Sequence, residues 1–340
     1  MKVMTVGCDV AKNEIVVCVS VKDSIEKLPA VPNDLAGFKA LLREVKKLKQ
    51  KHRGYKVQVV LEPTGGYEMG LAMFAHQQDW QVCLVNPKQV RDWANSQGQR
   101  AKTDALDARM LAEYAVQRPK NKPLPLWQPL PDSLIQLSSL LDRRRDLEQM
   151  LLQETNRQGM VANRPSMDQV VLDNLDAHIS SLNQSLDAIN QAIAALIDKD
   201  PAMKVQIKQL DSVPGVGPKV VLPLYVLLAR WHFITNGTGS PKALTAFVGF
   251  DPITHQSGQS TRQGGISKTG DPEMRRLLYM AALGGKRGKN PLRDFFDHLV
   301  GNNKIKMVAL IAAARKVLTW SWAVFRSHSF FDPLLHVKNA

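Results

Sequence analysis

The sequence predicts an α/β domain, then a long helical arm, then a mainly α-helical C-terminal domain. Three observations favour this arrangement. β-rich and helical segments alternate early in the chain, a proline-rich stretch follows, and apolar residues then recur at coiled-coil spacing. A chain of 340 residues with 44% hydrophobic composition can build two or three domains with buried cores. We place the domains at 1–125, 126–200 and 201–340.

The N-terminal segments follow the order of a ribonuclease-H-like core. Two β-rich runs, at 2–9 and 14–21, flank a short polar linker, which predicts an antiparallel hairpin. The elements expected after it are a helix at 34–51, a strand at 57–61, a helix near 68–78 and a strand at 81–85. A hairpin followed by alternating helices and strands indicates an α/β sheet of this class.

A linker and two long helices are expected next. The prolines between Pro119 and Pro131 predict an extended linker, and helical patterns then run on either side of a break at 159–165. The second pattern carries a heptad seam: Leu175, Ile179, Leu182, Leu186, Ile189, Ile193 and Leu196. An antiparallel coiled-coil hairpin used for dimerisation is one interpretation. A helical bundle packed on its own domain is the other.

The C-terminal part carries most of the positive charge. Of a net charge of +14, residues 201–340 contribute +12, with 19 Lys and Arg against 7 Asp and Glu. Such a region favours a polyanionic partner, and nucleic acid fits better than an anionic membrane. The segment 213–218 (VPGVGP) is typical of a helix-hairpin-helix turn that approaches phosphate, or of a plain turn between helices. Further helices are expected at 218–231, 241–248, 271–284 and 304–326.

The cysteines and the termini indicate the compartment. Cys8, Cys18 and Cys83 lie in apolar runs without metal-ligand spacing, as reduced core residues of a cytosolic protein do. The sequence shows neither a signal-peptide pattern nor 18 consecutive apolar residues. We therefore expect a cytoplasmic protein without a membrane partner.

Four carboxylates occupy positions that suit metal chemistry. Asp9 and Glu62 each end a predicted strand, and a Pro-Thr-Gly-Gly turn follows Glu62. Asp104 and Asp107 share one face of a predicted helix, for which Thr103 is a suitable N-cap. Converging carboxylates of this kind bind Mg²⁺ or Mn²⁺ for phosphodiester chemistry. Taken singly, each could instead be a turn residue or part of a solvated helix face.

A polar, glycine-containing loop is expected at 249–260, and a strongly basic stretch follows it. A serine in such surroundings could attack a phosphate, because nearby cations stabilise the charge that develops. The alternative is that these serines only hydrogen-bond to DNA or within turns.

These motifs together resemble the Piv-type DEDD transposases and invertases, whose insertion-sequence members are bridge-RNA-guided recombinases. The resemblance covers nearly the whole chain. It rests on VGCDVAKNE, LEPTGGYE, KTDALDARMLA, VPGVGP, FVGFDP and SGQSTRQGGISKTGDPEMRRLLYMAA.

The resemblance implies a RuvC-like N-terminal domain, a coiled-coil arm and a C-terminal transposase domain. It implies that Mg²⁺ or Mn²⁺ is bound by Asp9, Glu62, Asp104 and Asp107. The nucleophile would be Ser257 of the Ser-Gly motif, with Ser260 and Ser267 as alternatives. The implied reaction cuts donor and target double-stranded DNA through a phosphoserine link and exchanges strands through a Holliday-junction-like intermediate.

The implied partners are DNA, a non-coding guide RNA and further copies of the chain, in a dimer or tetramer. We expect nucleic acid to be bound by Lys102, Arg109, Lys219, Arg262, Lys268, Arg275 and Arg276. Three other functions stay open: a protein-only DNA invertase, a Holliday-junction nuclease that uses metal-activated water, and a non-catalytic nucleic-acid-binding protein.

Overall fold

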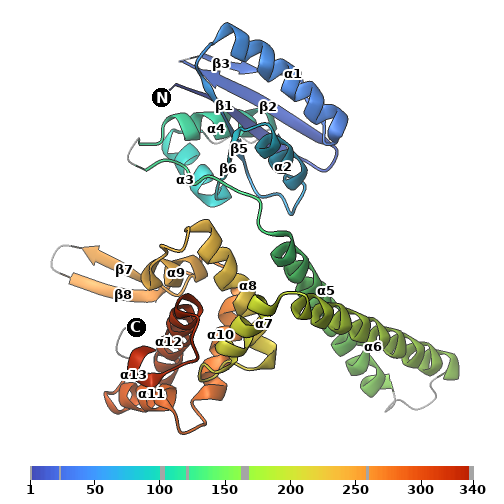
Figure 1. Cartoon of the computed structure of the whole chain (residues 1–340), viewed down its shortest axis with the longest axis vertical. Coiled ribbons are helices and arrows are strands. Elements are labelled where there is room, and N and C mark those ends of the chain that lie inside the picture. Colours follow the sequence, from blue (N-terminus) through green and yellow to red (C-terminus); the bar gives the residue numbers. More distant parts are fainter. Residues whose placement is uncertain are drawn as a thin grey trace. The chain divides into compact units, whose positions relative to one another are not determined.

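The computed structural model describes residues 2–22, 24–99, 104–119, 122–161, 168–257 and 260–336. The side chains at 104–105, 254–257, 260–263 and 335–336 lie outside the description. The chain divides into two compact units, Met1–Pro129 and Leu130–Ala340 (Figure 1).

A six-stranded mixed sheet forms the centre of the N-terminal unit. Its strands are β1 (Val3–Val10), β2 (Glu14–Val21), β3 (Ser24–Lys27), β4 (Val31–Pro32), β5 (Lys56–Leu61) and β6 (Gln81–Leu84). The strand order is β3-β2-β1-β5-β6, with β4 paired to β2. Strand β1 is antiparallel to β2 and parallel to β5, so the sheet opens with the expected hairpin and continues with parallel crossovers.

Helices cover both faces of this sheet. They are α1 (Leu35–Lys51), α2 (Met69–Gln77), α3 (Pro87–Ser96) and α4 (Asp104–Val116). Because successive strand residues point to opposite faces, Val59 packs in one core with α1 and α2, whereas Val60 packs in another with α3 and α4. The mixed α/β class predicted for this unit is therefore confirmed.

Gly7 is the point where helix α4 comes closest to the sheet. A Cβ atom at this position would lie 2.3 Å from the Ala108 carbonyl oxygen and 2.6 Å from the Ala112 nitrogen. Ala108 and Ala112 are fully buried, and their small side chains permit the approach. Helix α4 therefore lies directly against β1, on the face toward which the odd-numbered residues of that strand point.

Helices build most of the second unit. Its elements are α5 (Asp132–Val161), α6 (Gln169–Asp198), α7 (Pro201–Asp211), α8 (Pro218–Ile234), α9 (Pro241–Val248), β7 (Pro252–Ser257), β8 (Ser260–Ile266), α10 (Pro272–Gly285), α11 (Pro291–Gly301), α12 (Lys306–Ser327) and α13 (Pro333–His336). Helix α12 is long and apolar enough to cross a membrane, but most of its apolar stretch is buried. Its residues Trp320 and Trp322 are 1% exposed, which makes α12 the central core helix of this unit.

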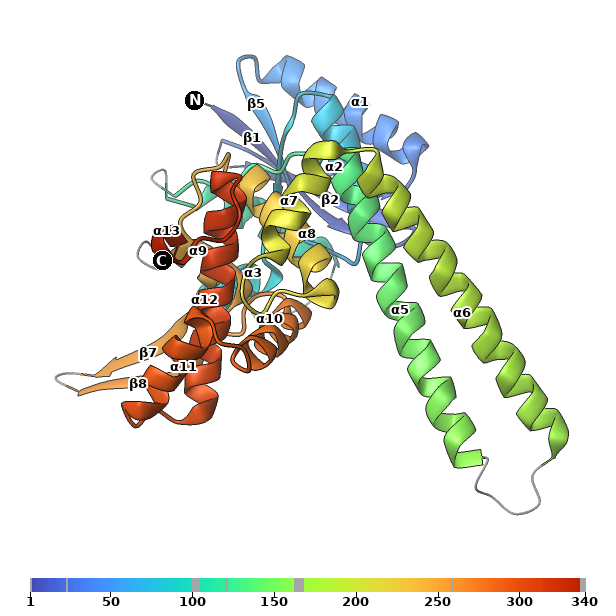
Figure 2. The same ribbon diagram turned by 60° about the horizontal axis from the view of Figure 1, so that its bottom comes forward.

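Helices α5 and α6 lie side by side in both views (Figures 1 and 2). Near its start, α5 contributes Leu137 to the main core of the unit. Farther along, Leu147 packs instead with Leu182 and Leu186 of α6 in a separate small cluster. The start of α5 thus packs against the main core of the unit, whereas farther along α5 and α6 pack against each other.

Most elements expected from the sequence are present, at similar bounds. The expectation for 249–260 was wrong, because strands β7 and β8 form an antiparallel hairpin there.

Gly215, in the proline-glycine turn between α7 and α8, has a packing role. A Cβ atom there would lie 2.4 Å from the Ala281 carbonyl oxygen of α10. The three cysteines are buried and free, as expected.

The Gly7→Ala variant tests the contact between α4 and β1. We expect it to lower the free energy of unfolding of the N-terminal unit by about 1–3 kcal/mol, because the added methyl group overlaps the α4 backbone. Hydrogen exchange of the β1 and β5 amides measures this loss. Gly159→Ala is the control, since a Cβ atom there meets nothing within 4 Å. Unchanged protection in the Gly7→Ala protein would contradict the role of this contact.

Candidate active site

Asp9 and Glu62 lie at the carboxyl ends of adjacent parallel strands. The last paired residues of β1 and β5 are Cys8 and Leu61, and the two acids follow them directly. Neighbouring strands are about 4.8 Å apart, so the backbone positions of the two acids are adjacent. By strand alternation, Asp9 belongs to the face of Gly7 and Glu62 to that of Val60, which is the face covered by α3 and α4. Both acids are half-buried.

Asp107 reaches the same face from helix α4. It directly precedes Ala108, whose carbonyl oxygen lies over Gly7. The Asp107 side chain is only 18% exposed, and its Oδ1 atom lies 3.7 Å from Nη2 of Arg91 in α3. That distance allows an ion pair but is too long for a hydrogen bond.

The Oδ1 atom of Asp107 is buried and accepts no hydrogen bond from the described part of the chain. A buried acceptor in this state is costly, so native proteins normally supply a partner. A bound cation is one such partner, and carboxylate oxygens are the ligands that Mg²⁺ prefers. The surroundings of Asp107 therefore fit a metal ion.

The acids do not form a complete metal cage among the described side chains. Asp104 is the first residue of α4, but its side chain lies outside the description. Without it, no group of three or more His, Cys, Asp or Glu side chains lies close enough to hold a metal ion. Asp9, Glu62 and Asp107 are thus brought to one face of the sheet.

Glu68 organises the turn that follows Glu62, and the sequence analysis missed it. Its Oε2 atom accepts hydrogen bonds from the Thr64 and Gly66 amides, at 3.0 and 2.9 Å, and from the Thr64 hydroxyl, at 3.1 Å. Burial raises the pKa of Glu68, but these hydrogen bonds outweigh it, so the pKa lies below its ordinary value. The signal was present in LEPTGGYE, where an acid follows two glycines at turn spacing.

Asn33 ties together the loops that follow Asp9 and Glu62. Its side-chain amide donates to the Ala11 carbonyl, at 3.0 Å, and to the Tyr67 carbonyl, at 3.1 Å. One side chain thus connects the turn after β1 to the turn after β5. Nothing in the sequence around Asn33 indicates this role, since its partners are distant in the chain.

The candidate nucleophile lies at the end of the β7–β8 hairpin. Ser257 is the last residue of β7, and its Cα pairs with that of Ser260, the first residue of β8. The side chains of both serines lie outside the description. Ser267 follows β8, and its hydroxyl donates a hydrogen bond to the carboxylate of Asp251. Ser267 therefore has a local structural role.

The basic residues expected to bind nucleic acid differ in their surroundings. Arg109 pairs with Glu113 at 2.8 Å, and Arg276 pairs with Glu273 at 2.6 Å. Arg275 donates to the Val248 and Gly270 carbonyls and joins α10 to the end of α9. Lys219 and Lys268 are exposed. Lys102 and the side chain of Arg262 lie outside the description.

Comparison with known proteins places both parts of the site within recognised regions. A family model described as Transposase, of the DEDD IS110 type, matches residues 6–161, which contain all four candidate metal ligands. A second model, described as Transposase IS116/IS110/IS902 family, matches 207–297, which contains Ser257.

Full-length relatives extend the similarity to the whole chain. The pilin gene-inverting protein of Moraxella lacunata is 30% identical over 97% of this chain and 98% of its own length. The pilin gene-inverting protein of Moraxella bovis matches with the same identity and coverage. An uncharacterized 43.6 kDa protein of insertion element IS110 from Streptomyces coelicolor is 24% identical over 48% of this chain and 38% of its own length.

The Glu68→Gln variant tests the turn after Glu62. We expect it to lower the free energy of unfolding at neutral pH by about 1–3 kcal/mol, because charge-assisted hydrogen bonds to Thr64 and Gly66 are weakened. The pKa of Glu68 is lowered on folding, so its contribution is present above the ordinary value of 4.5 and is lost as the pH falls through the folded pKa.

Urea unfolding of both proteins across this pH range measures the difference, with hydrogen exchange of the sheet amides as the probe. The gap between wild type and Glu68→Gln should shrink as the pH falls below 4.5. Glu26→Gln, at an exposed position in β3, is the control and should show no such trend. A pH-independent gap would contradict the role of the ionised carboxylate.

Proposed function

The chain belongs to the IS110 family of transposases, and on that premise we propose that it cuts and rejoins DNA with a metal-assisted serine nucleophile. One observation above all supports the metal part of the proposal. The close approach of α4 at Gly7 brings Asp107 to the sheet face of Asp9 and Glu62, where its Oδ1 atom is buried without a hydrogen-bond donor. Such a site suits the chemistry of a phosphodiester.

In this proposal Mg²⁺ or Mn²⁺ is held by Asp9, Glu62, Asp104 and Asp107. When bound, the ion would neutralise charge on the non-bridging phosphate oxygens and stabilise the leaving oxygen. Arg91 lies beside Asp107 and holds that carboxylate in the site. Asn33 and Glu68 act as positioning residues, because they order the turns that follow Asp9 and Glu62.

Ser257 is the proposed nucleophile of the cleavage step. Its Oγ atom bonds to the phosphorus of the scissile phosphodiester as the bond from phosphorus to one bridging sugar oxygen breaks. The serine proton passes to a base or to solvent, and the leaving oxygen takes up a proton. The phosphoserine link conserves the energy of the broken bond, so rejoining needs no ATP. Ser257 lies within the region, 207–297, that matches the Transposase IS116/IS110/IS902 family model, which supports this role.

A structured non-coding RNA is proposed to supply the sequence specificity, by base pairing with donor and target DNA. The protein would then read backbone and shape, which the +14 net charge supports. A protein-only DNA invertase is the second candidate. The observation that favours it is the match, over nearly the whole chain, to pilin gene-inverting proteins.

The paired helices α5 and α6 are the proposed coiled-coil contact between copies of the chain, in a dimer or tetramer. Their far ends expose large apolar side chains, among them Leu152, Met160 and Val170 at 60–72% exposure. Exposed apolar side chains of this size often mark contact sites between proteins.

The Ser257→Ala variant tests the nucleophile. Labelled DNA is incubated with the full chain, its co-purified RNA and Mg²⁺, and protein-linked DNA is read on a denaturing gel. We expect wild type to form adducts and Ser257→Ala to form none, because the variant lacks the attacking oxygen. Ser260→Ala and Ser267→Ala are the matched controls and should still form adducts.

Asp9→Asn, in the same assay, should also lose the adducts, because the metal loses a charged ligand. DNA cutting without any adduct in wild type would instead assign the protein to the nucleases that use metal-activated water. Adducts that persist in Ser257→Ala would exclude Ser257 as the nucleophile. Full activity in Asp9→Asn would exclude the acidic site.

Sequencing the RNA that co-purifies with the chain tests the guide. We expect one discrete, structured species, because guiding requires a defined RNA. The protein is purified from cells that carry its gene together with the flanking genomic DNA and, for comparison, from cells that carry the gene alone. Random fragments in both preparations, together with DNA inversion at fixed sites, would support the protein-only invertase.

A further inference from the structure

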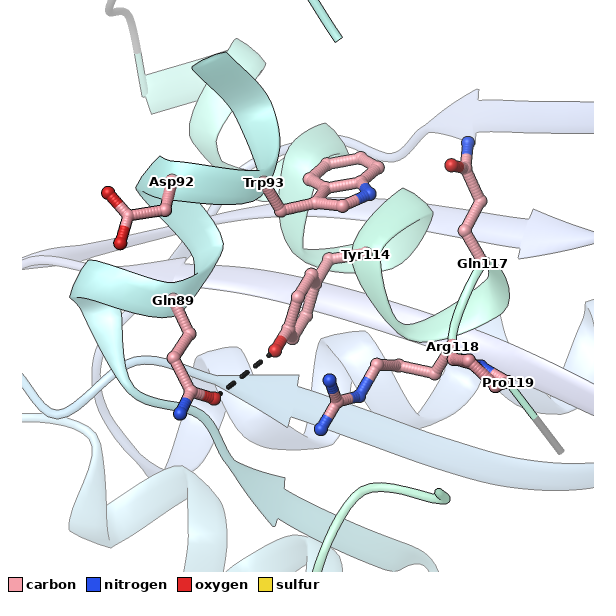
Figure 3. Close-up of a pocket in the computed structure, with 7 residues that line it drawn as sticks. All are labelled: Gln89, Asp92, Trp93, Tyr114, Gln117, Arg118 and Pro119. Carbon is pink, nitrogen blue, oxygen red and sulfur yellow. Dashed lines mark hydrogen bonds between the residues drawn. The ribbon is translucent and has the colours of Figure 1, made fainter. Parts of the chain in front are cut away.

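A pocket of about 380 Å³ lies between helices α3 and α4 of the N-terminal unit (Figure 3). Helix α3 contributes Gln89, Asp92 and Trp93, and α4 with the residues that follow it contributes Tyr114 and Arg118. The volume falls in the range of sites that hold small organic groups. Asp9, Glu62 and Asp107 are not among the described residues that line this pocket, so it is distinct from the part of the proposed active site that they form.

One wall of the pocket, the half-buried ring of Trp93, offers a flat surface on which a base can stack. The Trp93 and Tyr114 rings meet edge to face, with 5.7 Å between their centroids. Tyr114 is buried, whereas Trp93 is half-buried and borders the opening. The Arg118 guanidinium lies 5.3 Å from the centre of the Tyr114 ring. Tyr114 and Arg118 thus pack together behind Trp93, and an accessible aromatic ring such as that of Trp93 is the usual platform for an unstacked nucleobase.

Polar groups around this platform match the edge of a base. The Nε–H group of Arg118 is buried and has no hydrogen-bond partner in the described part of the chain, so it can donate to a ligand. Asp92 and Gln117 are exposed at the rim, and Gln89 accepts a long hydrogen bond of 3.4 Å from the Tyr114 hydroxyl. Carboxylates accept hydrogen bonds from cytosine, and side-chain amides can pair with adenine.

The charge of the pocket argues against a phosphate as its main ligand. Among the described lining residues Arg118 is the single cation, and the carboxylate of Asp92 opposes it. A DNA duplex does not fit either, because its bases are stacked inside the helix and unavailable to rings that line a pocket. A single base turned out of its strand satisfies both the accessible Trp93 ring and the polar rim.

The distance between the pocket and Asp107 suits the binding of one DNA strand to both. Tyr114 follows Asp107 on the same helix by roughly two turns, or about 10 Å along the axis. Arg91, which pairs with Asp107, directly precedes Asp92 in α3. Successive bases in a strand are about 3.4 Å apart, so this spacing corresponds to a few nucleotides.

We propose that this pocket binds one unstacked base of the DNA strand being cut, a few nucleotides from the scissile phosphate. The proposal rests on the function proposed above, since it takes its ligand to be the cleaved strand. Capture of this base holds the strand in register with the carboxylates. It also favours DNA that is already unpaired at this position, because turning out a paired base costs free energy.

The test uses DNA strands in which one nucleotide at a time, around the cleavage position, is made abasic. Binding to the full chain as purified is measured by fluorescence anisotropy in EDTA, so that no cutting occurs. For wild type, we expect one position at which the abasic change weakens binding by about 5- to 100-fold, the range expected for losing one stacked base. In the Trp93→Leu variant, the abasic change at that position should have no further effect.

Arg118→Gln, which removes the charge and the Nε donor, should weaken binding of the intact strand and leave duplex binding unchanged. Arg43→Gln, at an exposed position in α1, is the matched control and should bind the strand as wild type does. Because Trp93 packs beside the core formed by Val60 and Cys83, hydrogen exchange checks that the variant is folded. If it is not, Gln117→Ala at the exposed rim takes its place.

A second measurement locates the base directly. A strand with 5-iodouracil at the sensitive position is cross-linked by ultraviolet light, and the attached peptide is identified by mass spectrometry. Attachment within α3 or residues 114–119 supports the proposal. Attachment elsewhere, no abasic-sensitive position, or cross-linking of an RNA strand in place of DNA would overturn it. Because the Ser257→Ala protein can be used throughout, failure of the proposed cleavage chemistry is distinguished from failure of the pocket.

Discussion

The N-terminal unit depends on a missing side chain at Gly7. With no Cβ there, the backbone of α4 approaches β1 so closely that any larger residue would overlap the Ala108 carbonyl. That approach determines where the start of α4 lies on the sheet, and so where Asp107 meets the strand ends that carry Asp9 and Glu62. A close backbone contact is a rigid support, because packed interiors do not deform continuously.

Around this support the chain adds polar contacts that order the two turns beside the acids. Glu68 closes the turn after β5 with hydrogen bonds to two backbone amides, and Asn33 joins that turn to the one after β1. A buried carboxylate such as that of Glu68 stabilises a loop only when its hydrogen bonds are complete. Such hydrogen bonds fix the backbone of these turns, so that the acids beside them are held in place although the turns lie outside the sheet.

The same helices serve two chemistries in the proposed function. Helix α4 carries Asp107 near its start, and its far end lines a pocket together with Trp93 of α3. A helix is stiff, so the spacing between a cut phosphate and a captured base would be set by the rise per residue. The second unit contributes the hairpin that carries Ser257 and a core centred on α12.

Local sequence determined the type of most elements, because strand alternation, helical periodicity and turn residues are encoded within a few positions of each other. It also identified Asp9 and Glu62 as strand-end acids. The β7–β8 hairpin was missed although its pairing is local, because its polar, glycine-containing segment lacks the apolar alternation of a strand. Only the tertiary structure decided what depends on distant pairs: the bridging role of Asn33, and the pocket that Trp93 and Tyr114 share. These contacts join residues far apart in the chain, and their free energy exists only once both partners are in place.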